Sequence, residues 1–228
     1  MIEPILCIET SGKPCSVALS SLGESKVSLS TNGDWQHSKY LALLIKEVCD
    51  NAKISIKDLV AVAISKGPGS YTGLRVGTSA AKAICYSFDI PLIAVPTLEI
   101  LAFPHIKEAE ENSALIVPMI DARRQEVYYN VYNKDLTPTI TTTNLVLESN
   151  SFKDYQAQNL IIVGDGAEKA KNLLKGPNLT FKPTIVSAAF MSRLAYGAFK
   201  AEKIESTAYF TPFYLKPPNI TKSKKSLF

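Results

Sequence analysis

The order of strands and helices expected from this sequence occurs twice, and this repeat is the strongest constraint on the fold. Each half opens with an apolar strand that ends in an acid, Glu9 in the first half and Asp121 in the second. A tight turn and a returning strand follow in both halves, and the two starts lie about 110 residues apart. A duplicated β-β-β-α-β-α order with apolar, parallel strands predicts two α/β lobes side by side.

Apolar runs bounded by turn residues predict the strands, and apolar residues at helical intervals predict the helices. We expect Thr97 to cap a short helix and Pro104 to end it. In the first half the expected strands are 4–10, 15–22, 24–31, 58–65 and 90–95. The expected helices are 37–52, a helix that follows the glycine-rich loop and ends at about residue 88, and 98–103. In the second half the expected strands are 114–121, 126–133, 137–147 and 159–166, and the expected helices are 167–174 and 191–204.

Two α/β lobes built by duplication resemble the actin-like and sugar-kinase-like folds, a group of ATPases with ribonuclease H-like lobes. We expect an N-terminal lobe over residues 1–105 and a C-terminal lobe over 106–228. The last helix and the tail are expected to pack back on the first lobe. Working members of this fold hold Mg²⁺ and nucleotide phosphates between two hairpins that carry an aspartate and glycines.

The composition excludes several classes of protein. The chain has 228 residues, a hydrophobic share of 46% and a net charge of +4, which is ordinary for a globular protein and does not demand nucleic acid. Its four cysteines lack C-x-x-C spacing and it has two histidines, so we expect no metal site. We find no signal peptide and no apolar run of about 18 residues, so we expect a cytoplasmic protein without membrane contact.

The glycine-rich stretch KGPGSYTGLRVGTSAAKAI, residues 66–84, first suggests a phosphate loop. Its spacing matches neither the P-loop, which needs a lysine after the second glycine, nor the dinucleotide pattern G-x-G-x-x-G. The start of the helix after this loop has free backbone amides that could bind an anion near Arg75. A purely structural turn is the alternative, and the sequence leaves both open.

The helix after the loop carries small residues on one face. Gly73, Gly77 and Ala81 recur every four residues, with Ala80 beside them. Glycine in a helix costs about 1 kcal/mol relative to alanine, which indicates a neighbour too close for a Cβ. That neighbour is either the chain's own sheet or first helix, or a helix of another subunit.

Neither hairpin fits a nucleotide clamp. In the first, Lys13 and Pro14 occupy turn positions where glycine would let backbone amides approach a phosphate. The second has no glycine, and its charged tip is either a solvated turn with internal salt bridges or a charged docking surface. We expect no catalytic residue, because His37 beside Ser38 is more simply a residue at a helix end than part of a nucleophile-base pair.

The motifs together resemble one family. ILCIETSGKPCSVAL, HSKYLALLI, MIDARRQEVYYNVY, VGDGA and TPFYLKPP occur in the order typical of the TsaB family, also called YeaZ. The chain has Glu9 where aspartate is commoner, and residues 135–158 match loosely. The most specific part is the signature loop, whose residues are Gly67, Pro68, Gly69, Ser70, Tyr71, Thr72, Gly73 and Arg75.

The resemblance implies a dimerization subunit of tRNA threonylcarbamoyladenosine synthesis, without a cofactor or catalytic activity of its own. Its implied partners are the catalytic paralogue TsaD, which modifies the adenosine 3′ to the anticodon, and the ATPase TsaE, with tRNA bound through the complex. The TsaD contact would use the first-lobe helices, which would also pair the isolated chain as a homodimer. The expected interface residues are His37, Leu41, Leu44, Ile45, Val48, Gly73, Gly77, Ala80, Ala81 and Ile84.

Two alternatives remain open. The chain could act alone as a metallopeptidase of the glycoprotease type or as a small-molecule kinase of the same superfamily. The metal-binding paralogue has an H-x-x-x-H pattern, whereas here Leu41 stands four residues after His37. The basic tail could also bind tRNA directly, or it could be a solvated end.

Overall fold

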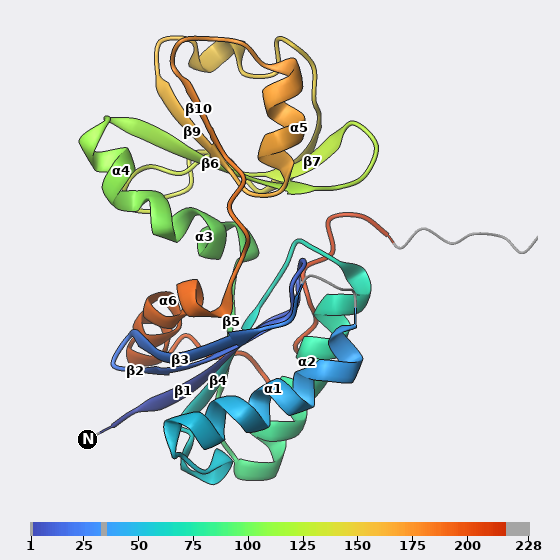
Figure 1. Ribbon diagram of the computed structural model, residues 1–228, viewed down its shortest axis with the longest axis vertical. Helices are drawn as coiled ribbons and strands as arrows, with labels where there is room; N and C mark the ends of the chain where they lie inside the picture. Colours follow the sequence, from blue (N-terminus) through green and yellow to red (C-terminus); the bar gives the residue numbers. More distant parts are fainter. Residues whose placement is uncertain (1, 33–35, 218–228) are drawn as a thin grey trace, which may run out of the picture.

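The computed structural model describes residues 2–32 and 36–217, which form two lobes, each built on a five-stranded sheet (Figure 1). The first sheet has the order β3-β2-β1-β4-β5. Its strands are β1 (Pro4–Glu9), β2 (Ser16–Ser21), β3 (Glu24–Ser30), β4 (Ala61–Ser65) and β5 (Leu92–Val95).

The second sheet repeats this arrangement. Read from β8, its order is β8-β7-β6-β9-β10, which matches the first sheet strand for strand. The central strand of each sheet is antiparallel to the next strand in the chain and parallel to the one after the crossover. The duplicated α/β fold of the actin-like kind is thus confirmed. The strands are β6 (Ala114–Asp121), β7 (Glu126–Tyr129), β8 (Thr143–Val146), β9 (Asn159–Val163) and β10 (Leu179–Lys182).

The second lobe differs from the expected order in two places. Strand β10, which pairs with β9, was not predicted, because its four residues are at most half-buried and show no clear alternation. The helix that follows the third strand in the first lobe is reduced to the 3-10 turn η3 (Lys153–Tyr155). Helix α5 (Gly166–Leu173) covers one face of this sheet, as predicted.

Three helices cover the first sheet. Helices α1 (His37–Ala52) and α2 (Tyr71–Phe88) lie together on one face, and α6 (Ala188–Lys200) lies on the other (Figure 1). The apolar stripe predicted for α1 is buried against β2 and β3. The 3-10 turn η1 (Ile56–Asp58) connects α1 to β4. Helix α6 therefore returns the chain from the second lobe to the first.

Two short helices pack between the lobes. Helix α3 (Thr97–Ala102) ends just before Pro104, close to the predicted end, but the chain continues through the 3-10 turn η2 (Phe103–His105) into α4 (Ile106–Glu111), neither of which was predicted. Proline fits the first turn of η2, where its missing N–H is not needed. Both α3 and α4 contact β6 of the second sheet, although residue 105 was the expected boundary between the lobes.

Thr97 is the first residue of α3 rather than its cap, so the prediction that Thr97 caps this helix was wrong. The cap position belongs to Pro96. The Thr97 hydroxyl instead accepts a hydrogen bond of 3.1 Å from the backbone N–H of Gly67. The side chain therefore positions the glycine-rich loop.

Apolar residues form three clusters, one of which joins the lobes. That cluster includes Ile5 of the first sheet, Ile116 of the second and Met191 of α6, all fully buried. Full burial of such a side chain contributes about 1.5–3 kcal/mol, so this cluster resists separation of the lobes. A second cluster lies beneath α1 and α2, and a third lies in the second lobe beneath α5.

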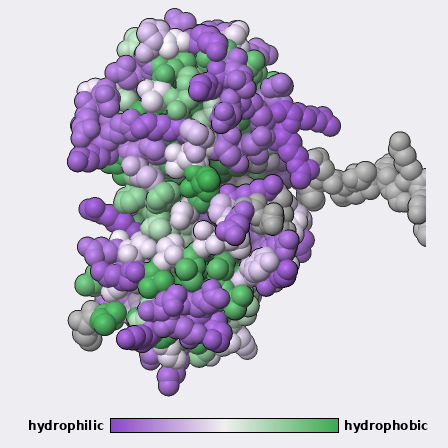
Figure 2. Space-filling view, viewed as in Figure 1, coloured by the Kyte–Doolittle hydropathy of each residue, from purple (hydrophilic) through white to green (hydrophobic). Residues whose placement is uncertain are grey.

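The exposed surface is mixed in polarity. On the face shown in Figure 2, hydrophobic residues are visible at the waist between the lobes and in patches on the first lobe, among many hydrophilic ones. Within the described ranges, no helix combines the length and the apolar character that a membrane span requires.

Candidate functional site

The signature loop connects β4 to α2 and is held by close contacts with the C-terminal segment. Gly67 has a φ of +107°, a backbone region that side chains rarely adopt, and a Cβ there would lie 2.5 Å from the carbonyl oxygen of Phe213. Phe213 N–H donates a 2.8 Å hydrogen bond to the Lys66 carbonyl. Only glycine fits this position, because the loop both turns and meets another backbone.

The start of α2 is tied to the turn between β1 and β2. The Ser70 N–H donates to the Ser11 carbonyl over 2.6 Å, and the Ser70 hydroxyl accepts from the Gly73 N–H over 3.2 Å. Ser70 is thus the N-cap of α2, a position for which serine is well suited. The close approach of the chain's own turn favours the structural interpretation of this loop over an anion site.

The small residues of α2 face the chain's own first strand. A Cβ on Gly73 would lie 2.0 Å from the Thr10 carbonyl oxygen, and one on Gly77 would lie 2.2 Å from the Thr10 hydroxyl. Ala81 is fully buried in the cluster beneath α2. The interpretation of this stripe as a seam with another subunit is therefore wrong, since the close neighbour is the end of β1.

Arg75 lies beside the loop but is bound to an aromatic pair. Its Nη1 donates a 3.1 Å hydrogen bond to the Tyr71 hydroxyl, and its guanidinium lies 5.4 Å from the centre of the Tyr71 ring. The rings of Tyr71 and Tyr214 are 4.8 Å apart. The aromatic pair therefore holds both Arg75 and the C-terminal segment at the start of α2.

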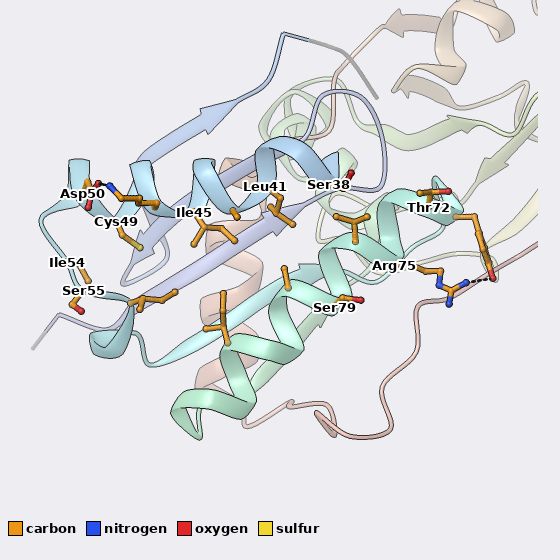
Figure 3. Close-up of a pocket in the computed structure, with 17 residues that line it drawn as sticks. Ser38, Leu41, Ile45, Cys49, Asp50, Ile54, Ser55, Thr72, Arg75 and Ser79 are labelled. Atoms are coloured by element: carbon orange, nitrogen blue, oxygen red, sulfur yellow. Dashed lines mark hydrogen bonds and ion pairs between the residues drawn. The ribbon is translucent and has the colours of Figure 1, made fainter. Parts of the chain in front are cut away.

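An apolar groove of about 940 Å³ runs between α1 and α2 (Figure 3). Leu41 and Ile45 point into it from α1, and Ala80 lies on the α2 side. The lining surface is mostly apolar, and Lys46 pairs with Asp50 at the rim over 2.6 Å. The residues that line it are Ser38, Leu41, Ala42, Ile45, Lys46, Cys49, Asp50, Ile54, Ser55, Ile56, Tyr71, Thr72, Arg75, Val76, Ser79, Ala80 and Ile84.

Four of the ten expected interface residues line this groove, namely Leu41, Ile45, Ala80 and Ile84. The other six do not, and each is buried inside the chain: His37, Leu44, Val48, Gly73, Gly77 and Ala81.

His37 shows why a residue at the start of α1 can be buried. Its Nε2 lies 2.9 Å from the Gly12 carbonyl, to which it donates, and this contact ties the helix to the β1–β2 turn. Sequence reasoning missed Val76, although it stands four residues before Ala80 and eight before Ile84 on one face of α2. It also missed Ile54 and Ile56, which follow α1 in a segment without helical periodicity.

The first hairpin buries a carboxyl group where a nucleotide clamp would need an open site. Glu9 is fully buried, and its Oε1 accepts a 2.6 Å hydrogen bond from the Ser11 N–H. Burial raises the pKa of Glu9, so the protonated form is favoured. Burial is the larger effect, and the buried side chains of Ser11 and Ser65 oppose it by lowering the pKa of Glu9.

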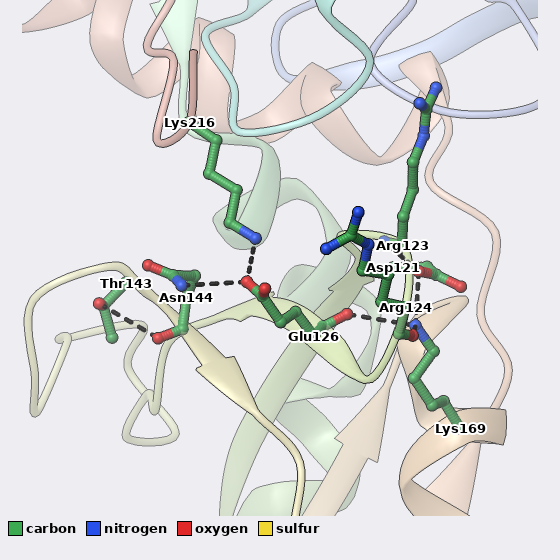
Figure 4. Close-up of polar contacts among 8 residues, drawn as sticks. All are labelled: Asp121, Arg123, Arg124, Glu126, Thr143, Asn144, Lys169 and Lys216. Carbon is green, nitrogen blue, oxygen red and sulfur yellow. Dashed lines mark hydrogen bonds and ion pairs between the residues drawn. The ribbon is translucent and has the colours of Figure 1, made fainter. Parts of the chain in front are cut away.

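Two acids of the second hairpin form ion pairs with lysines of other segments of the chain (Figure 4). Lys169 lies 2.6 Å from Asp121, and Lys216 is bonded to Glu126. In the part of the chain that the structure describes, no group of three or more His, Cys, Asp or Glu side chains is arranged for a metal ion.

Comparisons with known proteins place these features in one family. The profile of the family described as "TsaD: tRNA N6-adenosine threonylcarbamoyltransferase" matches residues 33–222. The chain is 36% identical to the "tRNA threonylcarbamoyladenosine biosynthesis protein TsaB" of Buchnera aphidicola subsp. Schizaphis graminum, over 75% of this chain and 82% of that protein. It is 27% identical to the TsaB of Haemophilus influenzae, over 93% of each chain.

The fold agrees with a solved structure. YeaZ from Pseudomonas aeruginosa superposes with a TM-score of 0.80 at 24% identity, over 93% of this chain and all of that one. At this identity the similarity supports the fold alone. With the family profile and the 36% identical relative, the conclusion is direct: the chain belongs to the TsaB (YeaZ) family, which is related to TsaD.

Proposed function

We propose that this chain is a non-catalytic partner subunit in the synthesis of threonylcarbamoyladenosine in tRNA. It binds a transferase of the TsaD type in the cytoplasm and activates it to modify the adenosine 3′ to the anticodon, and a TsaE-type ATPase joins the pair. The observation that carries this proposal is the exposed apolar groove between α1 and α2. Membership of a family whose relatives are called tRNA threonylcarbamoyladenosine biosynthesis proteins supports it.

The groove has the features of a helix-binding surface. Its floor is formed by aliphatic side chains of two helices, and its charged residues lie at the rim. Ridges of a second helix pair would fit between α1 and α2, as side chains do in four-helix packing. Burial of such a surface contributes about 25 cal/mol per Å², which favours association in water. In the absence of the transferase, a second copy of the chain would use the same groove, which gives a homodimer.

The two hairpins support a role without nucleotide chemistry. Glu9 is buried and hydrogen-bonded inside its own turn, and Asp121 is paired with Lys169. Arg123 and Arg124 occupy the second turn, where backbone amides would otherwise approach a phosphate. The chain therefore lacks the open, glycine-lined hairpins that a kinase of this fold would need.

Charge insertion in the groove tests the interface. Ala42 is exposed and lines the groove, so Ala42→Arg should not unfold the chain but should place a charge in the contact. We expect at least about a tenfold loss of affinity for the transferase, since a buried, unpaired charge costs about 2 kcal/mol or more. Titration calorimetry with TsaD from the same organism measures this, with Ala201→Arg as a matched control on another exposed alanine.

Equal affinity for the transferase in both variants would exclude the groove as the interface. Reconstitution of threonylcarbamoylation on tRNA, with and without this chain, tests the role itself. Full activity in its absence would refute the partner function, whereas stoichiometric Mg-ATP binding by the isolated chain would favour a kinase.

A further inference from the structure

The apolar groove between α1 and α2 carries an unbalanced charge at one end. Arg75 lines this end and is exposed, and among the described residues no carboxylate forms an ion pair with its guanidinium. At the opposite end, Lys46 and Asp50 neutralise each other over 2.6 Å. Figure 3 shows Arg75 and Asp50 toward the two ends of the groove. The groove is therefore apolar along its length, neutral at one end and positive at the other.

Two helix N-termini lie at the same end as Arg75. Both α1 and α2 begin there, near Ser38 and Thr72, and both run toward the end at which Asp50 lies (Figure 3). The free backbone amides of a helix N-terminus carry a partial positive charge. Neither helix has an acid in its first turn to balance that charge. This end of the groove therefore attracts a negative group.

The guanidinium of Arg75 is held in place by an aromatic neighbour. Its Nη1 donates a 3.1 Å hydrogen bond to the Tyr71 hydroxyl, and its centre lies 5.4 Å from the centre of the Tyr71 ring. Tyr71 is in turn packed on Tyr214. A side chain that is already ordered loses less conformational entropy when a partner binds. Arg75 is thus a positioned cation beside an apolar surface.

We propose that Arg75 determines the specificity of the groove by binding a carboxylate of the partner. This inference rests on the proposed function, because the groove is then the contact with the transferase. The occupant is a helix of the transferase whose apolar stripe fills the groove and which carries an aspartate or glutamate at the Arg75 end. The forked donors of arginine fit a carboxylate through two parallel hydrogen bonds.

A second copy of the chain is the poorer occupant of this groove. Asp50 is the single acid among the described residues that line it, and Asp50 is already paired with Lys46. If two copies met through their grooves, each Arg75 would face a lining whose acid has a partner. A charge that is compensated in one complex and left unpaired in another discriminates between the two partners. Arg75 therefore favours the transferase over self-association.

The test uses the full chain with Arg75→Gln, which removes the charge and keeps a residue that is well suited to a helix. Arg193→Gln is the matched control, because it makes the same change at an exposed position of another helix, α6. Titration calorimetry measures the affinity for TsaD from the same organism at about 50 and about 300 mM salt. Sedimentation equilibrium measures self-association of each variant.

We expect Arg75→Gln to weaken binding of the transferase about tenfold at low salt, and less at high salt, where ions screen the pair. Self-association should be unchanged or stronger, since two unpaired charges are removed from a contact between copies. Charge reversal by Arg75→Glu should weaken transferase binding more, by about 100-fold. The Arg193→Gln chain should keep both wild-type affinities.

Three results would overturn the inference: wild-type affinity of Arg75→Gln for the transferase at low salt, an equal loss in Arg193→Gln, or an equal weakening of self-association by Arg75→Gln. The Ala42→Arg variant separates this inference from the proposed function. If Ala42→Arg weakens transferase binding and Arg75→Gln does not, the groove remains the interface and the carboxylate contact is refuted. If Ala42→Arg leaves transferase binding unchanged, the interface lies elsewhere and both conclusions are refuted.

Discussion

Alanine substitution of the two helical glycines that face Thr10 tests how α2 is placed on the sheet. The nearest neighbour of a Cβ on Gly73 is the Thr10 carbonyl oxygen, 2.0 Å away, and a carbonyl cannot move without its strand. The nearest neighbour of a Cβ on Gly77 is the Thr10 hydroxyl, 2.2 Å away, which belongs to a buried side chain. Both contacts are far shorter than the ordinary separation of about 3.5 Å.

The size of the effect follows from two opposing contributions to the free energy of unfolding. Alanine gains about 1 kcal/mol over glycine in a helix. Overpacking costs about 1–3 kcal/mol, and more where the backbone must shift. We therefore expect Gly73→Ala to destabilise the chain by about 2 kcal/mol or more, and Gly77→Ala by about 1 kcal/mol.

Urea denaturation followed by circular dichroism measures these changes, and Gly197→Ala is the matched control. Gly197 lies in α6 with no atom within 4 Å of an added Cβ, so this substitution should stabilise the chain by about 1 kcal/mol. For a chain of this size, each kcal/mol corresponds to a shift of about 2–4 °C in Tm.

A double-mutant cycle identifies the neighbour. Thr10→Ala removes the hydroxyl that a Cβ on Gly77 would meet, so Gly77→Ala should become neutral or stabilising in that background. Gly73→Ala should stay destabilising, because its obstacle is the backbone carbonyl. If Gly77→Ala alone stabilised the chain as much as Gly197→Ala, the packing argument for the glycine stripe would be refuted.

Three further predictions concern protonation and the tail. Burial raises the pKa of Glu9 above its ordinary value of 4.5, so the stability that its proton supplies is present below pH 4.5 and lost as the pH rises through the folded pKa. Glu9→Gln should remove this decline in the urea midpoint, and a parallel decline in both proteins would contradict it. Burial lowers the pKa of His105 below 6.5, so its contribution is present above pH 6.5 and lost as the pH falls through the folded pKa. His105→Gln should flatten the acid side of the stability profile, whereas an unchanged acid slope would exclude His105 as its cause. Tyr214→Ala removes the stacking on Tyr71 and should cost about 0.5–1.5 kcal/mol in urea denaturation, whereas Tyr209→Ala, at 87% exposure, should cost close to nothing.

The long, periodic helices and strands could be predicted because the spacing of their apolar residues indicates which face is buried. Helix α1 covers the predicted residues 37–52, and its stripe is the buried one. The strands of the first lobe were predicted from apolar runs in the same way, and all five were found. Strand β10 is short and at most half-buried, so its sequence shows no apolar pattern that would distinguish a strand from a loop.

The candidate site was only partly predictable, because spacing identifies a face of a helix but not its neighbour. Gly73 and Gly77 had the spacing of a subunit seam, yet β1 of the same chain occupies that face. Leu41 and Ile45, which were predicted to contact a partner, line the groove, since one stripe of α1 contributes to both the core and the groove edge. Whether a helix face packs inside the chain or lines the groove depends on how the helices pack on the sheet, which is a property of the tertiary structure.

The signature loop and the groove are linked by the same contacts, so a motif that resembles a phosphate loop determines the shape of the proposed binding surface. Ser70 caps α2 and binds Ser11, while Gly73 and Gly77 let the helix approach the end of β1. A bulkier residue at either glycine would push α2 away from the sheet and change its distance to α1. The two glycines therefore determine the width of the groove between the helices, although neither glycine lines it. A substitution that weakens transferase binding need not lie in the contact, and Gly77→Ala should lower both stability and affinity, whereas Ala42→Arg should lower affinity alone.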